Sequence, residues 1–138
     1  VITFGATGTY NFKFTSNDGG TTITVYDLNR PLNVYTNPLF LTGSEDLAAS
    51  AAASLTVPVS YFSTAAAETA TLAAGTTGQI KTFMMVADGG DMVITVTNAG
   101  WKSSGTGTIT FNDIGDGCTL QYINNKWYCI GQNGVSFG

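Results

Sequence analysis

Apolar and polar residues alternate along much of this chain, and the alternation predicts β-strands. In residues 9–15, Tyr10, Phe12 and Phe14 share one face of an extended chain, and the residues between them are polar. A period of two is the pattern of a half-buried strand. The sequence SNDGG at residues 16–20 favours a turn, and residues 21–27 return with apolar alternate positions. We therefore expect a hairpin near the N-terminus.

A second hairpin is predicted where two apolar segments flank the sequence DGGD of residues 88–91. Residues 79–87 and 92–97 would be its arms. Residues 83–86 (FMMV) are apolar at successive positions, so we expect this strand to be covered on both faces, and another subunit can supply the second cover. Met84, Met85 and Met92 would cluster across this hairpin. Core filling is the default role for such residues, and a flexible protein-contact surface is the more specific hypothesis.

The C-terminal hairpin can be assigned a register. If Asn124 and Asn125 form a two-residue loop, Tyr122 faces Trp127 and Leu120 faces Cys129. One face then becomes entirely apolar, and a slip by one residue would mix the two faces, so this register is favoured. Cys118 and Cys129 fall on the apolar face but diagonally, which makes two buried thiols the simpler interpretation and a disulfide the alternative.

Further short strands are expected in residues 1–4, 55–62, 68–74, 108–111 and 135–137. Residues 44–54 (SEDLAASAAAS) are the single helical candidate, because Ser44 can cap a helix whose first turn carries Glu45 and Asp46. We expect at most one short helix near 45–53, or a loop there. The predicted fold is all-β, an antiparallel sandwich or barrel-like meander of short strands. We expect one domain over 1–138, with N-terminal strands in 1–43, the helix or loop in 44–54, and a β module in 55–138.

The amino-acid composition favours some classes of function and excludes others. Charged residues make up 10% of the 138 residues, against about 25% in an average domain. Such a surface suits a protein that works inside an assembly, or a secreted domain with a Thr-rich exterior. The net charge is −4 and the five cationic residues are scattered, so nucleic acid is not an expected partner. The sequence has no apolar run long enough to span a membrane.

The chain contains no histidine, which removes the commonest general base and metal ligand. The acidic turns at 88–91 and 113–116 could in principle hold calcium, but neither has the alternating carboxylates of a calcium loop. We expect no catalytic residues, no metal and no cofactor, and therefore no enzyme. Trp101 lies in the Gly/Ser-rich segment 98–107. It is predicted to pack onto the core edge, and the alternative is a contact residue, as in a carbohydrate-binding sandwich.

Four segments of the second half resemble structural proteins of tailed-bacteriophage virions. They are 71–81 (TLAAGTTGQIK), 87–93 (ADGGDMV), 107–116 (GTITFNDIGD) and 126–135 (KWYCIGQNGV). The resemblance is to a β module of uncharacterised virion proteins from phages of marine bacteria and cyanobacteria, and it covers about residues 55–138. It does not point to one place in the virion, since similar modules occur in fibre-like and capsid-decorating proteins, often as trimers.

The resemblance implies a protein at the surface of the phage particle. We expect a capsid decoration or cement protein, with the major capsid protein and copies of itself, as a homotrimer, as partners. A tail-fibre or spike component that binds a host glycan or protein is the alternative. Met84, Met85, Met92 and Trp101 are the candidate protein-contact residues.

Overall fold

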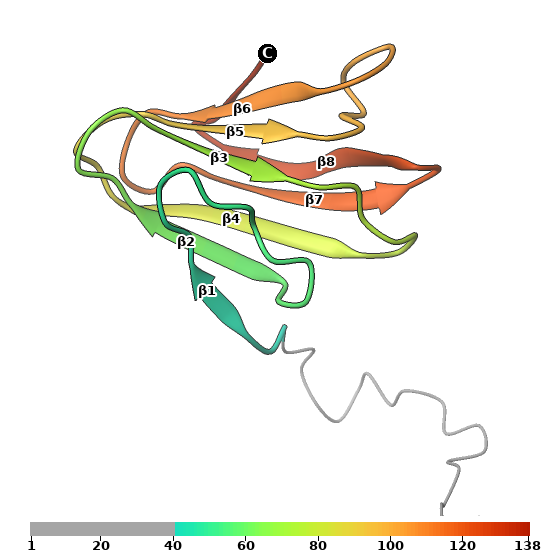
Figure 1. Ribbon diagram of the computed structural model, residues 1–138, viewed down its shortest axis with the longest axis horizontal. Coiled ribbons are helices and arrows are strands. Elements are labelled where there is room, and N and C mark those ends of the chain that lie inside the picture. The colour runs from blue at the N-terminus through green and yellow to red at the C-terminus, as the bar shows by residue number, and fades with distance from the viewer. Residues whose placement is uncertain (1–40) are drawn as a thin grey trace, which may run out of the picture. The chain divides into compact units, whose positions relative to one another are not determined.

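The computed structural model describes residues 41–138, which lie within a compact unit spanning Leu39–Gly138 (Figure 1). The predictions for residues 1–40, including the hairpin of residues 9–27, lie outside this part of the chain. Nine strands form in it, namely β1 (Ser44–Asp46), β2 (Val59–Ser63), β3 (Glu68–Leu72), β4 (Ile80–Ala87), β5 (Met92–Val96), β6 (Gly107–Phe111), β7 (Gly117–Ile123), β8 (Lys126–Asn133) and β9 (Ser136–Phe137).

The strands form two sheets that pack into a sandwich, which confirms the predicted all-β class. Sheet A has the order β1-β2-β4-β7-β8, and sheet B has the order β3-β5-β6-β9. Both sheets are mixed, because β1, β2 and β4 run parallel in sheet A, as do β3 and β5 in sheet B, while the later strands pair antiparallel. Neither sheet closes into a barrel.

The predicted hairpin of residues 79–97 is wrong. Strand β4 lies in sheet A and β5 in sheet B, so the connection between them crosses from one layer to the other (Figure 1). Backbone atoms of another segment lie so close to its two glycines that a side chain would not fit there. A Cβ on Gly89 would lie 2.5 Å from the carbonyl oxygen of Thr64, and one on Gly90 would lie 2.5 Å from the carbonyl carbon of Ala66. The β4–β5 connection therefore stacks directly on the β2–β3 connection, which makes the same crossing.

No helix forms in residues 41–138, so the helical alternative for 45–53 is wrong. The backbone donors of this segment bond to strands instead of to their own turn. The N–H of Leu47 donates to Tyr61, that of Ser50 to Thr69, and that of Ala53 to Thr71, at 2.8, 2.6 and 2.8 Å from the respective carbonyl oxygens. The segment thus runs along the edges of both sheets, where pairing supplies the bonds that a helix would have made.

The core lies between the sheets. Phe62 of sheet A meets Phe111 of sheet B edge to face, with ring centroids 5.0 Å apart. Trp127 is fully buried, and its indole nitrogen donates to the carbonyl oxygen of Ala73 at 2.9 Å. Every strand from β2 to β7 contributes inward side chains at alternate positions, as the period-two pattern requires.

The register predicted for the C-terminal hairpin is confirmed. Tyr122 pairs with Trp127 and Leu120 with Cys129, across a loop in which Asn124 and Asn125 have φ values of 48° and 59°. Asparagine tolerates this left-handed region better than most residues, which is why it suits a two-residue hairpin loop. A register shift between Thr119 and Leu120 was not predicted.

Candidate functional site

Within residues 41–138, the outer face of sheet A carries several accessible apolar side chains. Successive residues of a strand point to opposite faces, so the outward positions follow from the buried ones. On β2, β4 and β7, none of these positions carries a charge. The outer face of sheet A comprises Val59, Tyr61, Ser63, Ile80, Thr82, Met84, Val86, Gly117, Thr119, Gln121 and Ile123, with Tyr128 and Ile130 from β8.

Apolar side chains of this face are large and accessible. Ile130 is 57% exposed and Met84 is 38% exposed. Met84 pairs with Tyr61 on one side and with Gly117 on the other. A Cβ at Gly117 would lie 3.0 Å from the terminal methyl of Met84, so the methionine extends over the glycine of the neighbouring strand. Single exposed apolar residues are ordinary, whereas a continuous patch of them marks an interaction surface.

Two hydroxyl groups in the middle of this face are satisfied by each other. The hydroxyls of Thr82 and Thr119 lie on adjacent strands and are 3.1 Å apart, within hydrogen-bond distance. Charges occur only at the perimeter, with Asp46 on the edge strand β1 and Lys126 at the start of β8. The ammonium of Lys126 donates to the carbonyl oxygens of Lys102 and Ser103 at 2.8 and 3.1 Å. The centre of the face is therefore uncharged, and burying it against a partner would cost little electrostatic free energy.

The structure separates the three methionines that the sequence grouped together. Met85 and Met92 are 0% exposed and lie in the core between the sheets. Their assignment as contact residues is therefore corrected to core filling, because the hairpin that would have brought them together does not exist. Met84 alone remains a surface candidate. The expectation that β4 is covered on both faces is not met within the described chain, since Met84 and Val86 are exposed.

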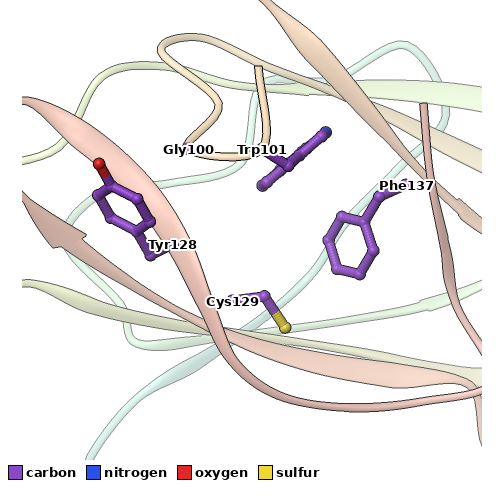
Figure 2. A pocket seen from close by; sticks show the side chains of 5 residues that line it. All are labelled: Gly100, Trp101, Tyr128, Cys129 and Phe137. Carbon is purple, nitrogen blue, oxygen red and sulfur yellow. The ribbon is translucent and has the colours of Figure 1, made fainter. Parts of the chain in front are cut away.

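A second candidate surface is a hollow beside Trp101, with a volume of about 290 Å³ (Figure 2). It is lined by Gly100, Trp101, Tyr128, Cys129 and Phe137. Trp101 meets Phe137 at an angle of 67° with ring centroids 4.7 Å apart, and its indole nitrogen donates to the carbonyl oxygen of Gly138. The prediction that Trp101 packs onto the core edge is thus confirmed, and the same side chain also forms one wall of the hollow.

Small residues hold Trp101 in this position. A Cβ on Gly107 would lie 2.5 Å from the indole nitrogen of Trp101, and one on Gly100 would lie 2.5 Å from the carbonyl oxygen of Trp127. Either substitution would move the tryptophan or its loop. The hollow has one side-chain hydroxyl, from Tyr128, and no charged lining residue. It is suited to an apolar or aromatic-stacking ligand group.

The buried ion pair of Lys81 and Glu45 was not predicted. Lys81 is 0% exposed, and its ammonium lies 3.0 Å from a carboxylate oxygen of Glu45. It also donates to the carbonyl oxygens of Ser54 and Val57 at 2.9 and 3.0 Å. An ammonium has three donors, so every one is used and none is free for chemistry. Lys81 therefore fastens the segment before β2 to the middle of sheet A.

The pKa directions agree with this structural role. Burial raises the pKa of the Glu45 carboxyl, but hydrogen bonds from Ser60, Lys81 and Ser54 together outweigh it and hold that pKa below its ordinary value. Burial lowers the pKa of Lys81, and the neighbouring Glu45 carboxylate opposes this shift. Perturbed groups of this kind often mark active sites. This pair differs because Lys81 and Glu45 bond to each other, to Ser60 and to backbone groups, and no buried side-chain polar atom of the described residues is left without a partner.

Both cysteines are free thiols, as the simpler interpretation held, but only Cys118 is buried, whereas Cys129 is half-buried. Burial, followed by the nearby Cys129, raises the pKa of Cys118 to about 12. A thiol with so high a pKa is not a nucleophile at neutral pH. Cys129 lies at the hollow, where its sulfur donates to the carbonyl oxygen of Gly131.

Aspartate carboxylates in the two acidic turns accept hydrogen bonds from backbone N–H groups nearby. A carboxylate oxygen of Asp116 accepts hydrogen bonds from the N–H groups of Asn112 and Asp113, at 2.8 and 3.1 Å, and so orders the β6–β7 loop. A carboxylate oxygen of Asp88 accepts from the N–H of Gly90. Within residues 41–138, no three Cys, Asp or Glu side chains gather as metal ligands would. Nor does this part of the chain contain a helix able to cross a membrane.

Comparison with protein-family models, with curated proteins and with solved structures finds no match to this chain. The two candidate surfaces therefore stand on geometry and sequence alone. Neither was fully predictable. The sequence indicated Trp101 and Met84, but Tyr128 and Ile130 join them only through the register of β7 and β8.

Proposed function

We propose that the protein is a structural protein of a bacteriophage virion, and specifically a capsid decoration or cement protein that acts as a homotrimer on the particle surface. Its role is to stabilise the head by contacting the major capsid protein and copies of itself, without catalysis. The observation that carries this proposal is the uncharged outer face of sheet A, with its exposed Met84, Val86 and Ile130. Such a face is adapted to burial against protein.

Three further features support the proposal. The motifs of residues 71–81, 87–93, 107–116 and 126–135 resemble phage virion proteins. The described residues bring together no set of groups that could act as nucleophile, base and orienting partner. The low charge suits a protein that meets several neighbours at once, since simultaneous weak contacts multiply into a strong one.

Imaging of labelled particles tests the location. Gold-labelled antibody against the protein, applied to intact virions, is expected to decorate the head uniformly in electron micrographs. Particles from which the protein has been omitted serve as the control, and they should lose their DNA at a lower temperature than complete particles. Label restricted to the tail, or absent from the particle, would contradict the capsid assignment.

The hollow beside Trp101 favours a second candidate, a tail-fibre or spike component that binds a host glycan. An aromatic wall next to a tyrosine hydroxyl is a common way to hold a sugar ring. On this alternative, a glycan array gives a reproducible signal that Trp101→Ala removes. Tyr61→Ala is the matched control, because it removes an exposed aromatic from the other surface. Equal signals from the native protein and Trp101→Ala would exclude the glycan role for this hollow.

A further inference from the structure

The outer face of sheet A has the size of a specific protein interface. Its five strands are spaced about 4.8 Å apart and have three to eight residues at about 3.3 Å each, which gives a face of about 24 Å by, on average, about 20 Å. Three such faces that meet around one axis would bury about 1,400 Å² in total, which is of the size of a specific protein contact.

The charge distribution indicates which partner fits. In a closed symmetric oligomer, residues near the axis meet their own counterparts, so any charge there meets a like charge. The chain carries a net charge of −4, yet the central strand β4 presents only Ile80, Thr82, Met84 and Val86 to this side. The outward positions of β3, β5 and β6 in sheet B are uncharged too, but they are mostly threonine. The outer face of sheet A is the one that is both uncharged and apolar at its centre, so two copies can contact there without repulsion.

The charged residues at the edges of this face are also compatible with a contact between copies of the chain. Asp46 and Lys126 lie on the two opposite edges of sheet A and carry opposite charges. A face with one charge of each sign at its two edges has no net charge to repel a copy of itself. A strongly acidic or basic partner would find no complementary charge in its centre, which makes a second copy the favoured occupant.

We propose that the outer face of sheet A is the contact between copies of this chain, with Met84 at its centre. This deepens the proposed function and rests on it for the homotrimer, in which the three faces would converge on the symmetry axis. Met84 is suited to such a place, because its flexible side chain can fill the irregular space where equivalent residues meet.

The test is the association state of the purified full-length chain, measured by sedimentation velocity between about 1 µM and 1 mM, the range in which contacts of this size associate. The native protein is expected to form a closed oligomer as concentration rises. Met84→Lys places equal charges together at the axis and is expected to weaken association at least about 30-fold, the scale of a central interface residue.

Thr69→Lys is the matched control. It also adds one positive charge, at an exposed residue of β3 in sheet B, away from the outer face of sheet A. It is expected to leave association unchanged. Circular dichroism of both variants verifies that each keeps the β fold, and Met84→Leu, which retains an apolar side chain, is expected to associate like the native protein.

Two outcomes would overturn the proposal. One is a native protein that stays monomeric up to 1 mM, as it would if another segment of its own chain occupied the face. The other is equal weakening by Met84→Lys and Thr69→Lys, which would reflect overall charge. Because no phage particle takes part, failure here leaves the imaging test of virion location untouched, and failure of that test leaves this one untouched.

Discussion

At the scale of single residues, the ion pair of Lys81 and Glu45 shows how one charged side chain can be folded into an apolar layer. On β4, Lys81 has the same parity as the inward Phe83 and Met85, so it points into the sandwich with them. Removing either residue would leave the other charge buried without a partner, and this costs far more free energy than the ion pair contributes.

Lys81→Met is therefore expected to destabilise the protein by about 3–5 kcal/mol, because Glu45 and two carbonyl oxygens lose their partner. Urea denaturation of the full chain measures this. Lys102→Met, at an exposed loop residue, is the control and is expected to change stability by less than about 0.5 kcal/mol. A change for Lys81→Met as small as that of the control would show that the ion pair is dispensable.

The same variant also changes the pH dependence. In the native protein the folded-state pKa of Glu45 lies below the ordinary value of 4.5. Its contribution is therefore complete above the unfolded-state pKa and is lost as the pH falls through the folded-state pKa. Without Lys81 the carboxyl loses one of the groups that lower its pKa, so its folded-state pKa rises toward the unfolded-state value. Urea denaturation at a series of pH values is therefore expected to show a smaller loss of stability between neutral and acid pH in Lys81→Met than in the native protein.

At the scale of elements, what a turn packs against decides whether it closes a hairpin or crosses between layers. The sequence correctly predicted strands at residues 79–87 and 92–97 and a turn between them. It could not predict that this turn lies on the backbone of residues 64–67, because that contact joins segments more than 20 residues apart. In the C-terminal hairpin the two arms are neighbours in sequence, and there the apolar pattern was enough to set the register.

This crossing gives a test with a pair of glycines. Gly89→Ala places a methyl group 2.5 Å from the carbonyl oxygen of Thr64, a backbone atom that cannot move aside alone. It is expected to lower the free energy of unfolding by about 1–3 kcal/mol, the usual cost of overpacking. Gly131→Ala, where a Cβ meets no atom within 4 Å, is expected to be close to neutral in the same thermal and urea denaturation experiments. Equal stability of the two variants would mean that the two connections do not touch.

At the scale of the whole molecule, the all-β class followed from the alternation of apolar and polar residues. The distribution of strands between the sheets did not, because parallel pairing of β2 with β4 and of β3 with β5 leaves no local signal. The candidate surfaces were predictable in part for the same reason. The sequence marked Met84 and Trp101 as unusual, but only the arrangement of strands separates Met84 from Met85 and joins Trp101 to Phe137.

The alternation of β2, β3, β4 and β5 between the layers has a consequence for how the unit breaks. Because these consecutive strands lie in different sheets, neither sheet can separate while the other stays folded. β2 and β4 are neighbours in sheet A, and the chain between them passes through β3 in sheet B. Under proteolysis or mechanical load, these strands are therefore expected to unfold together as one cooperative unit.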